Sequence, residues 1–157
     1  MKKILIIAVL SLVLWQVFKS PERMPSQVLP HYAAGQDMSR SLVGGRCPKD
    51  RCLLVVVAPW CPACRSMKGT IEALRDQLEA DGVPVTVLVA MDQADDLKTL
   101  AAAYAKPVAL DIDGQFHKRV GVDAVPYFAV TNAKAEIIEV MRGGMYDVAG
   151  MREELGL

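Results

Sequence analysis

The sequence has no excess of charge of either sign. Its 157 residues include 18 basic and 18 acidic side chains, the formal net charge is zero, and no basic block follows the lysines at positions 2 and 3. Nucleic-acid-binding proteins concentrate Lys and Arg on one face or along one helix. The composition therefore argues against a nucleic acid as a partner.

Histidine is scarce, and the few metal-binding residue types do not cluster. The two histidines, His31 and His117, have no second ligand at the spacing of a metal site, and we expect both at the surface. Asp111 and Asp113 are expected to shape a turn rather than to bind a metal ion. We predict no metal and no bound cofactor.

The chain has no internal repeat, so one domain is the simplest interpretation. Residues 31–157 are the length of a single domain. Residues 20–30 contain Pro21, Pro25 and Pro30 between polar residues, which predicts an extended linker. Residues 31–46 show no clear period and receive no prediction.

Residues 4–18 carry no charge. An uncharged run of this length after Lys2 and Lys3 is typical of an export signal, and it is shorter than the roughly 20 residues of an ordinary spanning helix. No small-x-small cleavage site follows closely. We therefore predict that residues 1–19 are an uncleaved signal anchor with the rest of the chain exported. A cleaved signal peptide is the alternative.

The most specific feature is the segment Trp-Cys-Pro-Ala-Cys at 60–64, which follows an apolar run at 53–58 after a single proline. Apolar residues then recur at helical spacing: Met67, Ile71, Leu74 and Leu78. A strand that leads into Cys-x-x-Cys at the start of a helix is the arrangement of a dithiol redox site. Because free backbone N–H groups and the helix dipole stabilise a thiolate there, Cys61 is the predicted nucleophile. We expect Cys61 to be exposed and Cys64, one turn later, to be partly buried.

The remaining hydrophobic pattern predicts an α/β architecture. Strands at 53–58 and 84–91 should be parallel neighbours joined by a helix at 62–80. The other expected elements are a helix at 93–105, a short strand at 108–112, a hairpin of strands at 127–131 and 136–142, and a closing helix at 147–155.

Three separated segments resemble the thioredoxin superfamily. They are Ala-Pro-Trp-Cys-Pro-Ala-Cys at 58–64, Gly-Val-Asp-Ala-Val-Pro at 121–126, and Gly-Gly at 143–144. Residues 106–114 and 120–122 are similar to the membrane-tethered TlpA/ResA/CcmG branch of extracytoplasmic thiol–disulfide reductases. The resemblance implies a thioredoxin fold, with a central mixed sheet flanked by helices, behind the N-terminal signal-anchor helix.

The resemblance also implies roles for individual residues. Cys61 and Cys64 would be the catalytic pair. Pro126 would follow a cis peptide bond beside them, so that the backbone of Val125 faces Cys61 and pairs with an extended substrate. Trp60 and Tyr127 would surround the thiol with apolar surface, although each is also plausible as a plain core residue.

Three departures from thioredoxin bear on catalysis. Val55 stands where thioredoxin has a buried aspartate, and residues 84–91 contain no basic residue to match its lysine. Gly69 stands where a proline usually kinks the helix. Without the aspartate, another group or water must take the proton from the second thiol.

Cys47 and Cys52 form a second pair on the other side of the strand at 53–58. Six strand residues at about 3.3 Å each put the pairs roughly 20 Å apart, which excludes direct sulfur exchange without rearrangement. We predict a local structural disulfide. A second redox or docking pair, or a zinc site of all four cysteines, are the alternatives.

The sequence thus predicts a thiol–disulfide oxidoreductase at the bacterial inner membrane, with its catalytic domain in the periplasm. It would reduce protein disulfides and would be served by a membrane redox partner. A dithiol oxidase of the DsbA type, or a non-enzymatic thioredoxin-like module that binds a partner or metal, are the alternatives.

Overall fold

The two apolar, β-branched segments form neighbouring parallel strands in the computed structural model, which describes residues 21–33 and 39–157. The seven strands are β1 Ser26–Tyr32, β2 Ser39–Gly44, β3 Cys52–Val57, β4 Val85–Val89, β5 Val108–Leu110, β6 Tyr127–Thr131 and β7 Ile137–Arg142. The described helices are α2 Pro62–Ser66, α3 Lys68–Ala80, α4 Ala94–Ala101, α5 Gln115–Val120 and α6 Val148–Leu155.

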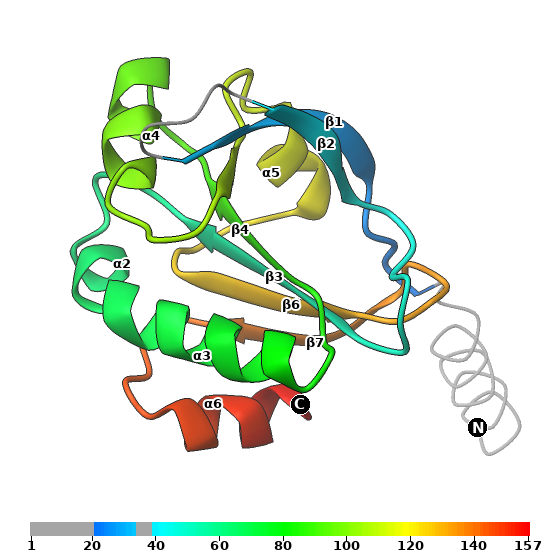
Figure 1. Ribbon diagram of the computed structural model, residues 1–157. Helices are drawn as coiled ribbons and strands as arrows, with labels where there is room; N and C mark the ends of the chain where they lie inside the picture. The colour runs from blue at the N-terminus through cyan, green and yellow to red at the C-terminus, as the bar shows by residue number, and fades with distance from the viewer. Residues whose placement is uncertain (1–20, 34–38) are drawn as a thin grey trace, which may run out of the picture.

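The strands make one mixed sheet in the order β2-β1-β5-β4-β3-β6-β7 (Figure 1). Strands β3, β4 and β5 are parallel to one another, and the other neighbours pair antiparallel. Because parallel strands run in one direction, the segments that follow β3, β4 and β5 all begin at the same end of these strands, their carboxyl ends. The cysteine pair of residues 61 and 64 lies at that end.

Side chains of the central strands alternate between two apolar layers. In β3, Val55 and Val57 pack with α3, α4 and α6, whereas Leu54 and Val56 pack on the other face with α5, β1 and β2. Helices thus cover both faces of the sheet, as the predicted α/β architecture requires. The mixed sheet flanked by helices is confirmed.

The helix predicted at 62–80 is divided at Met67 into α2 and α3. The hydrogen bonds from Met67 N to Ala63 O and from Ile71 N to Met67 O continue across the break, so the division is a local bend. Nothing lies within 4 Å of a Cβ built on Gly69. A larger side chain would therefore fit at position 69 without a steric clash.

The prediction of a linker over residues 20–30 is wrong for most of its length. Met24 is buried, Arg23 forms a bridge with Glu136, and β1 begins at Ser26. The unassigned stretch after residue 30 completes β1 and forms β2. Gly44, with φ of 74°, ends β2 opposite Ser26, and a Cβ there would collide with the Pro25 carbonyl oxygen and the Phe116 ring.

Residues 1–19, predicted to be a signal anchor, lie outside the described residues. Within the described ranges, no helix has the length and apolar character needed to cross a membrane.

Cys47 and Cys52 are joined by a disulfide with a Cα–Cα distance of 5.6 Å. Cys52 is the first residue of β3, so this disulfide lies at the end of the strand away from residues 61–64. Arg46 and the loop after it are held to the sheet at this point.

We expect the variant with both Cys47→Ser and Cys52→Ser to be less stable but equally active. A disulfide that closes so short a loop stabilises a domain by about 2 kcal/mol, so the melting temperature should fall by roughly 5 to 10 °C. Calorimetry measures this shift, and a disulfide-reduction assay on the folded variant measures activity. Loss of activity with unchanged stability would instead make the pair a second redox centre.

Candidate active site

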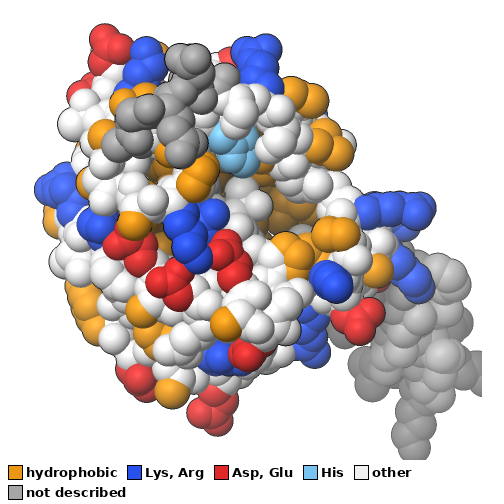
Figure 2. Space-filling model, viewed as in Figure 1, with side chains coloured by type: hydrophobic (Ala, Val, Ile, Leu, Met, Phe, Trp, Pro, Cys, Tyr) orange, Lys and Arg blue, Asp and Glu red, His pale blue; other side chains and the backbone are white. Residues whose placement is uncertain are grey.

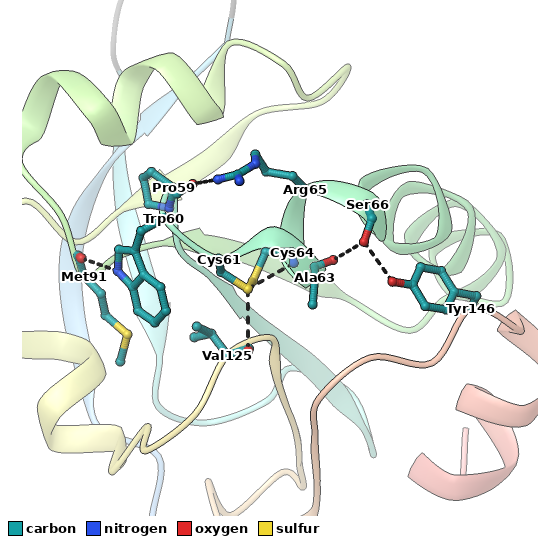
Figure 3. The surroundings of a disulfide bond; sticks show 10 residues. All are labelled: Pro59, Trp60, Cys61, Ala63, Cys64, Arg65, Ser66, Met91, Val125 and Tyr146. Carbon is teal, nitrogen blue, oxygen red and sulfur yellow. Dashed lines mark hydrogen bonds between the residues drawn. A yellow bond between two sulfur atoms is a disulfide. The ribbon is translucent and has the colours of Figure 1, made fainter.

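Cys61 and Cys64 lie where the chain leaves β3 and begins α2 (Figure 3). Cys61 is the N-cap of α2, with extended backbone, and Pro62 occupies the first turn, where its missing N–H costs nothing. The N–H of Cys64 donates to the Cys61 Sγ at 3.0 Å. The two sulfurs are bonded to each other. The Cys61 sulfur therefore sits where a negative charge would be stabilised by a backbone donor and by the helix dipole.

The expectation that Cys61 is exposed is wrong for the disulfide-bonded form. Its exposed fraction is 3%, against 0% for Cys64. The sulfur faces the loop before β6, and its distance to the Val125 carbonyl oxygen is 3.6 Å. Val125 also packs against the core layer that contains both cysteines. A partner that reaches the Cys61 sulfur must therefore approach along this loop.

The Val125–Pro126 peptide bond is cis, as the resemblance implied. The loop is tied to β7, because Gly143 N donates to Pro126 O at 2.9 Å and Arg142 Nε donates to Asp123 Oδ1 at 2.7 Å. The hydrogen bond from Arg142 lowers the pKa of Asp123, so this ion pair persists at neutral pH. These contacts fix Val125 opposite the cysteine pair.

Trp60 borders the cysteine pair, whereas Tyr127 does not. The Trp60 ring is 57% exposed, and its Nε1–H donates to the Met91 carbonyl at 2.9 Å. Tyr127 is buried in the opposite core layer, beneath α5, because alternation along β6 turns it away from α2. Burial raises the pKa of Tyr127. The prediction that Tyr127 contributes to the surface around the thiol is therefore wrong.

Tyr146 is a neighbour of the site that the sequence interpretation missed. Its ring is 62% exposed, and its hydroxyl lies 2.8 Å from Ser66 Oγ, on α2. In Figure 3, Trp60 and Tyr146 lie on opposite sides of the cysteine pair. The one signal in the sequence is an aromatic residue two positions after Gly143-Gly144, a pair that resembles the thioredoxin superfamily.

Cys64 has apolar surroundings. Among the described residues, the buried polar or charged side chains are Asp111, His117 and Thr131. Asp111 and His117 bond to each other at α5, on the other face of the sheet, and Thr131 pairs with Cys52 at the far end of β3. Val55 lies in the layer around Cys64 in place of a carboxylate. The site therefore contains no buried acid that would accept a proton from Cys64.

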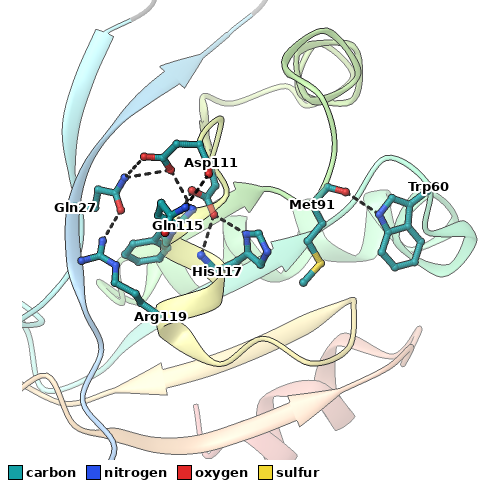
Figure 4. Close-up of polar contacts among 9 residues, drawn as sticks. Gln27, Trp60, Met91, Asp111, Gln115, His117 and Arg119 are labelled. Carbon is teal, nitrogen blue, oxygen red and sulfur yellow. Dashed lines mark hydrogen bonds and ion pairs between the residues drawn. The ribbon is translucent and has the colours of Figure 1, made fainter.

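His117 is buried, contrary to expectation, and pairs with Asp111. The two side chains meet at 2.7 Å between His117 Nδ1 and Asp111 Oδ2 (Figure 4). Asp111 also accepts the N–H groups of Phe116 and His117 at the start of α5. Asp113 accepts the N–H of Gln115. Both aspartates thus shape the turn into α5, as predicted.

The four cysteines form two separate disulfides at the two ends of β3. Over the described residues, no group of three His, Cys, Asp or Glu side chains is placed to hold a metal ion. His31 lies in β1 and contacts Ser41. The arrangement brings together Trp60, Cys61, Cys64 and Val125 with Tyr146, and leaves Cys47 and Cys52 apart.

Solved structures share this fold across most of the chain. StoA from Bacillus subtilis is 18% identical with a TM-score of 0.63, covering 85% of this chain and 98% of its own. The exposed lipoprotein thioredoxin of Streptococcus pneumoniae is 18% identical with a TM-score of 0.65, covering 84% and 98%. A secreted Mycobacterium tuberculosis disulfide oxidoreductase is 16% identical with a TM-score of 0.56, covering 68% and 81%.

The sequence itself places the chain in a family. No curated protein sequence matches it. The Redoxin family model matches residues 22–155, which include every described strand and helix up to the end of α6. The resemblance to thioredoxin-like proteins is thereby confirmed. The chain belongs to the Redoxin family of thioredoxin-fold oxidoreductases.

Proposed function

We propose that this protein is an extracytoplasmic thiol–disulfide oxidoreductase that reduces disulfides in other proteins through Cys61 and Cys64. The observation that carries the proposal is the N–H of Cys64 donating to the Cys61 sulfur at 3.0 Å, opposite the Val125 carbonyl. This geometry would stabilise a Cys61 thiolate beside the loop along which a substrate disulfide would approach.

The reaction begins with both cysteines reduced. The Cys61 thiolate attacks one sulfur of the substrate disulfide, a mixed disulfide forms, and the other substrate sulfur leaves as a thiolate that takes up a proton. Cys64 then loses its proton and attacks the Cys61 sulfur, which releases the second substrate thiol. Two electrons pass to the substrate, and the Cys61–Cys64 disulfide remains. The same steps in reverse would oxidise a dithiol.

The second step has a specific requirement in this chain. Cys64 is fully buried among apolar side chains, and the layer around it holds no carboxylate. Its proton must therefore pass to the departing substrate thiolate or to water admitted when the mixed disulfide forms. We expect this step to be the slower one.

The surroundings of Cys61 favour an extended polypeptide as substrate. The Val125 carbonyl faces the sulfur and could accept a backbone N–H, in the manner of an added strand. Trp60 and Tyr146 present exposed rings on either side, each held by a hydrogen bond. Apolar side chains next to the substrate cysteine would contact these rings.

The location outside the cytoplasm is supported by the uncharged run at 4–18 after two lysines. Two of the similar structures come from proteins described as an exposed lipoprotein and a secreted oxidoreductase. We propose that residues 1–19 anchor the protein in the bacterial inner membrane, with the domain in the periplasm and a membrane redox partner to reduce Cys61–Cys64. A soluble periplasmic form after signal cleavage is the alternative.

Substitution of the two cysteines should have opposite consequences. Cys61→Ser should reduce turnover of a protein disulfide to background, because Cys61 is the cysteine whose sulfur lies at the Val125 carbonyl. Cys64→Ser should accumulate mixed disulfides with substrates, because the resolving thiol is missing. Non-reducing gels and an insulin-reduction assay measure both, with the Cys47→Ser, Cys52→Ser variant as the active control. If Cys64→Ser turned over normally and trapped nothing, these roles would be wrong.

The direction of electron flow can be tested separately. The thiolate-stabilising contact at Cys61 and the Cys-Pro-x-Cys sequence favour a second candidate, a dithiol oxidase. Known potentials run from about −270 mV in thioredoxin to about −120 mV in DsbA. Because residues 106–114 and 120–122 resemble extracytoplasmic reductases, we expect the Cys61–Cys64 potential, measured by equilibration with glutathione, to lie nearer the first value. A potential near the second would favour the oxidase.

A further inference from the structure

A basic hollow lies near the start of β3, at the end of the central strands opposite the cysteine pair 61/64. It has a volume of about 530 Å³ and is lined by Arg23, Met24, Ser26, Gly45, Arg46, Lys134 and Ala135. These residues come from the segment leading into β1, from the loop before Cys47, and from the turn between β6 and β7. Figure 2 shows Lys and Arg side chains, with acidic side chain atoms below them, at the right-hand edge of the molecule, where Figure 1 places that turn.

The hollow has positive charge that the described part of the protein does not neutralise. Arg23, Arg46 and Lys134 are exposed, no acidic side chain lines the hollow, and the described residues offer none of the three an ion pair. The carboxylate of nearby Glu136 accepts a hydrogen bond from Asn132 instead. Three cations around one cavity are chemically suited to a phosphate group.

Backbone hydrogen bonds hold together the three segments that carry these cations. Arg23 bridges to Glu136, and the N–H of Met24 donates to Ala135 O at 2.8 Å, so the first and third segments are paired. Gly45 N donates to Pro25 O at 2.9 Å, which ties in the second segment. The Cys47–Cys52 disulfide follows Arg46 directly. The segments that line the hollow are therefore part of the folded domain.

The position of the hollow along the chain indicates its occupant. Arg23 follows the uncharged run at 4–18 by five residues, which span at most about 18 Å when fully extended. Ile137 N donates to the Glu22 carbonyl oxygen at 2.8 Å, so the folded domain has already begun at Glu22. If residues 4–18 lie in a membrane, Arg23 is within that short distance of the lipid headgroups. Basic clusters beside a membrane anchor are attracted to anionic lipids.

We propose that the hollow of Arg23, Arg46 and Lys134 binds the phosphate groups of anionic phospholipids and docks the domain on the membrane. This proposal rests on the membrane anchor of the proposed function. The parallel strands start at the docked end and finish at the opposite one, so docking turns Cys61 away from the membrane, toward soluble substrates. Reduction of Cys61–Cys64 by the membrane redox partner would then take place while the domain is undocked. The Cys47–Cys52 disulfide would then contribute to docking, because it holds the loop that carries Arg46.

The test uses the full chain, labelled with ¹⁵N, in nanodiscs that contain a headgroup spin-labelled lipid. In discs with phosphatidylglycerol, amide signals around residues 23, 45 and 134 should lose intensity, whereas signals of residues 143–146 should not. Discs of phosphatidylcholine alone should give no such pattern. Each cation neutralised to Gln should lower the ratio of docked to free domain about fivefold.

The matched control removes three cations elsewhere. Arg40→Gln, Lys98→Gln and Lys118→Gln together should leave docking unchanged, whereas Arg23→Gln, Arg46→Gln and Lys134→Gln together should abolish it. Both triple variants should keep disulfide-reducing activity, which shows that they fold. Equal signal loss in neutral and anionic discs, equal effects of the two triple variants, or occupation by inorganic phosphate with no lipid dependence would each overturn the proposal.

The remaining outcomes separate this proposal from the proposed function. A chain that does not enter nanodiscs but still reduces disulfides refutes both the anchor and the docking, and leaves the enzymatic assignment standing. A chain that enters, docks as described and reduces nothing refutes the enzymatic assignment alone.

Discussion

The interaction on which the proposed chemistry depends is the hydrogen bond from the Cys64 N–H to the Cys61 sulfur at the first turn of α2. It exists because β3 ends one short turn before the helix starts, and because Pro62 needs no hydrogen-bond acceptor in that turn. The apolar layers on both faces of β3 fix the direction from which the chain enters the helix. A shift of this strand would move the sulfur away from the Val125 carbonyl.

Strand β3 also separates two disulfides with different surroundings. Cys61–Cys64 follows its end and faces a loop that is tied to β7, whereas Cys52 begins the strand and is bonded to Cys47. One pair borders exposed aromatic rings, and the other borders a basic hollow. One end of β3 thus leads to a site suited to disulfide exchange with proteins, and the other end lies beside a hollow suited to an anionic surface.

Much of the fold could be predicted because local pattern and burial agree. The parallel pair β3 and β4, the hairpin of β6 and β7 and helix α6 lie at or within two residues of their predicted ranges. The cis bond before Pro126 came from the resemblance, since an X-Pro bond is trans by default. At the site, Cys61 and Cys64 lie at the helix start and Trp60 and Val125 lie beside them, as expected, but both cysteines are more buried than expected. Their roles stay predictions.

The failures came from tertiary context that no local pattern encodes. Prolines suggested a linker, but β5 pairs with only His31 and Tyr32 of β1, so Pro30 has β2 alone as a neighbour and its missing N–H is tolerated. Helix α5 has six residues and depends on Asp111, which precedes it by four positions. That distant cap also explains why His117 is buried. The prediction for Tyr127 failed because its face of the sheet depends on how β6 pairs with β3. The sequence of β6 alone does not show that pairing.

The most direct test of the central claim is the pKa of the Cys61 thiol. The rate of alkylation against pH should be measured on the Cys64→Ser variant, in which Cys47 and Cys52 stay bonded to each other. The helix start and its backbone donor predict a midpoint below the value of about 8.5 for a free cysteine. A midpoint at or above that value would show that the helix start does not stabilise the thiolate, and would contradict the account.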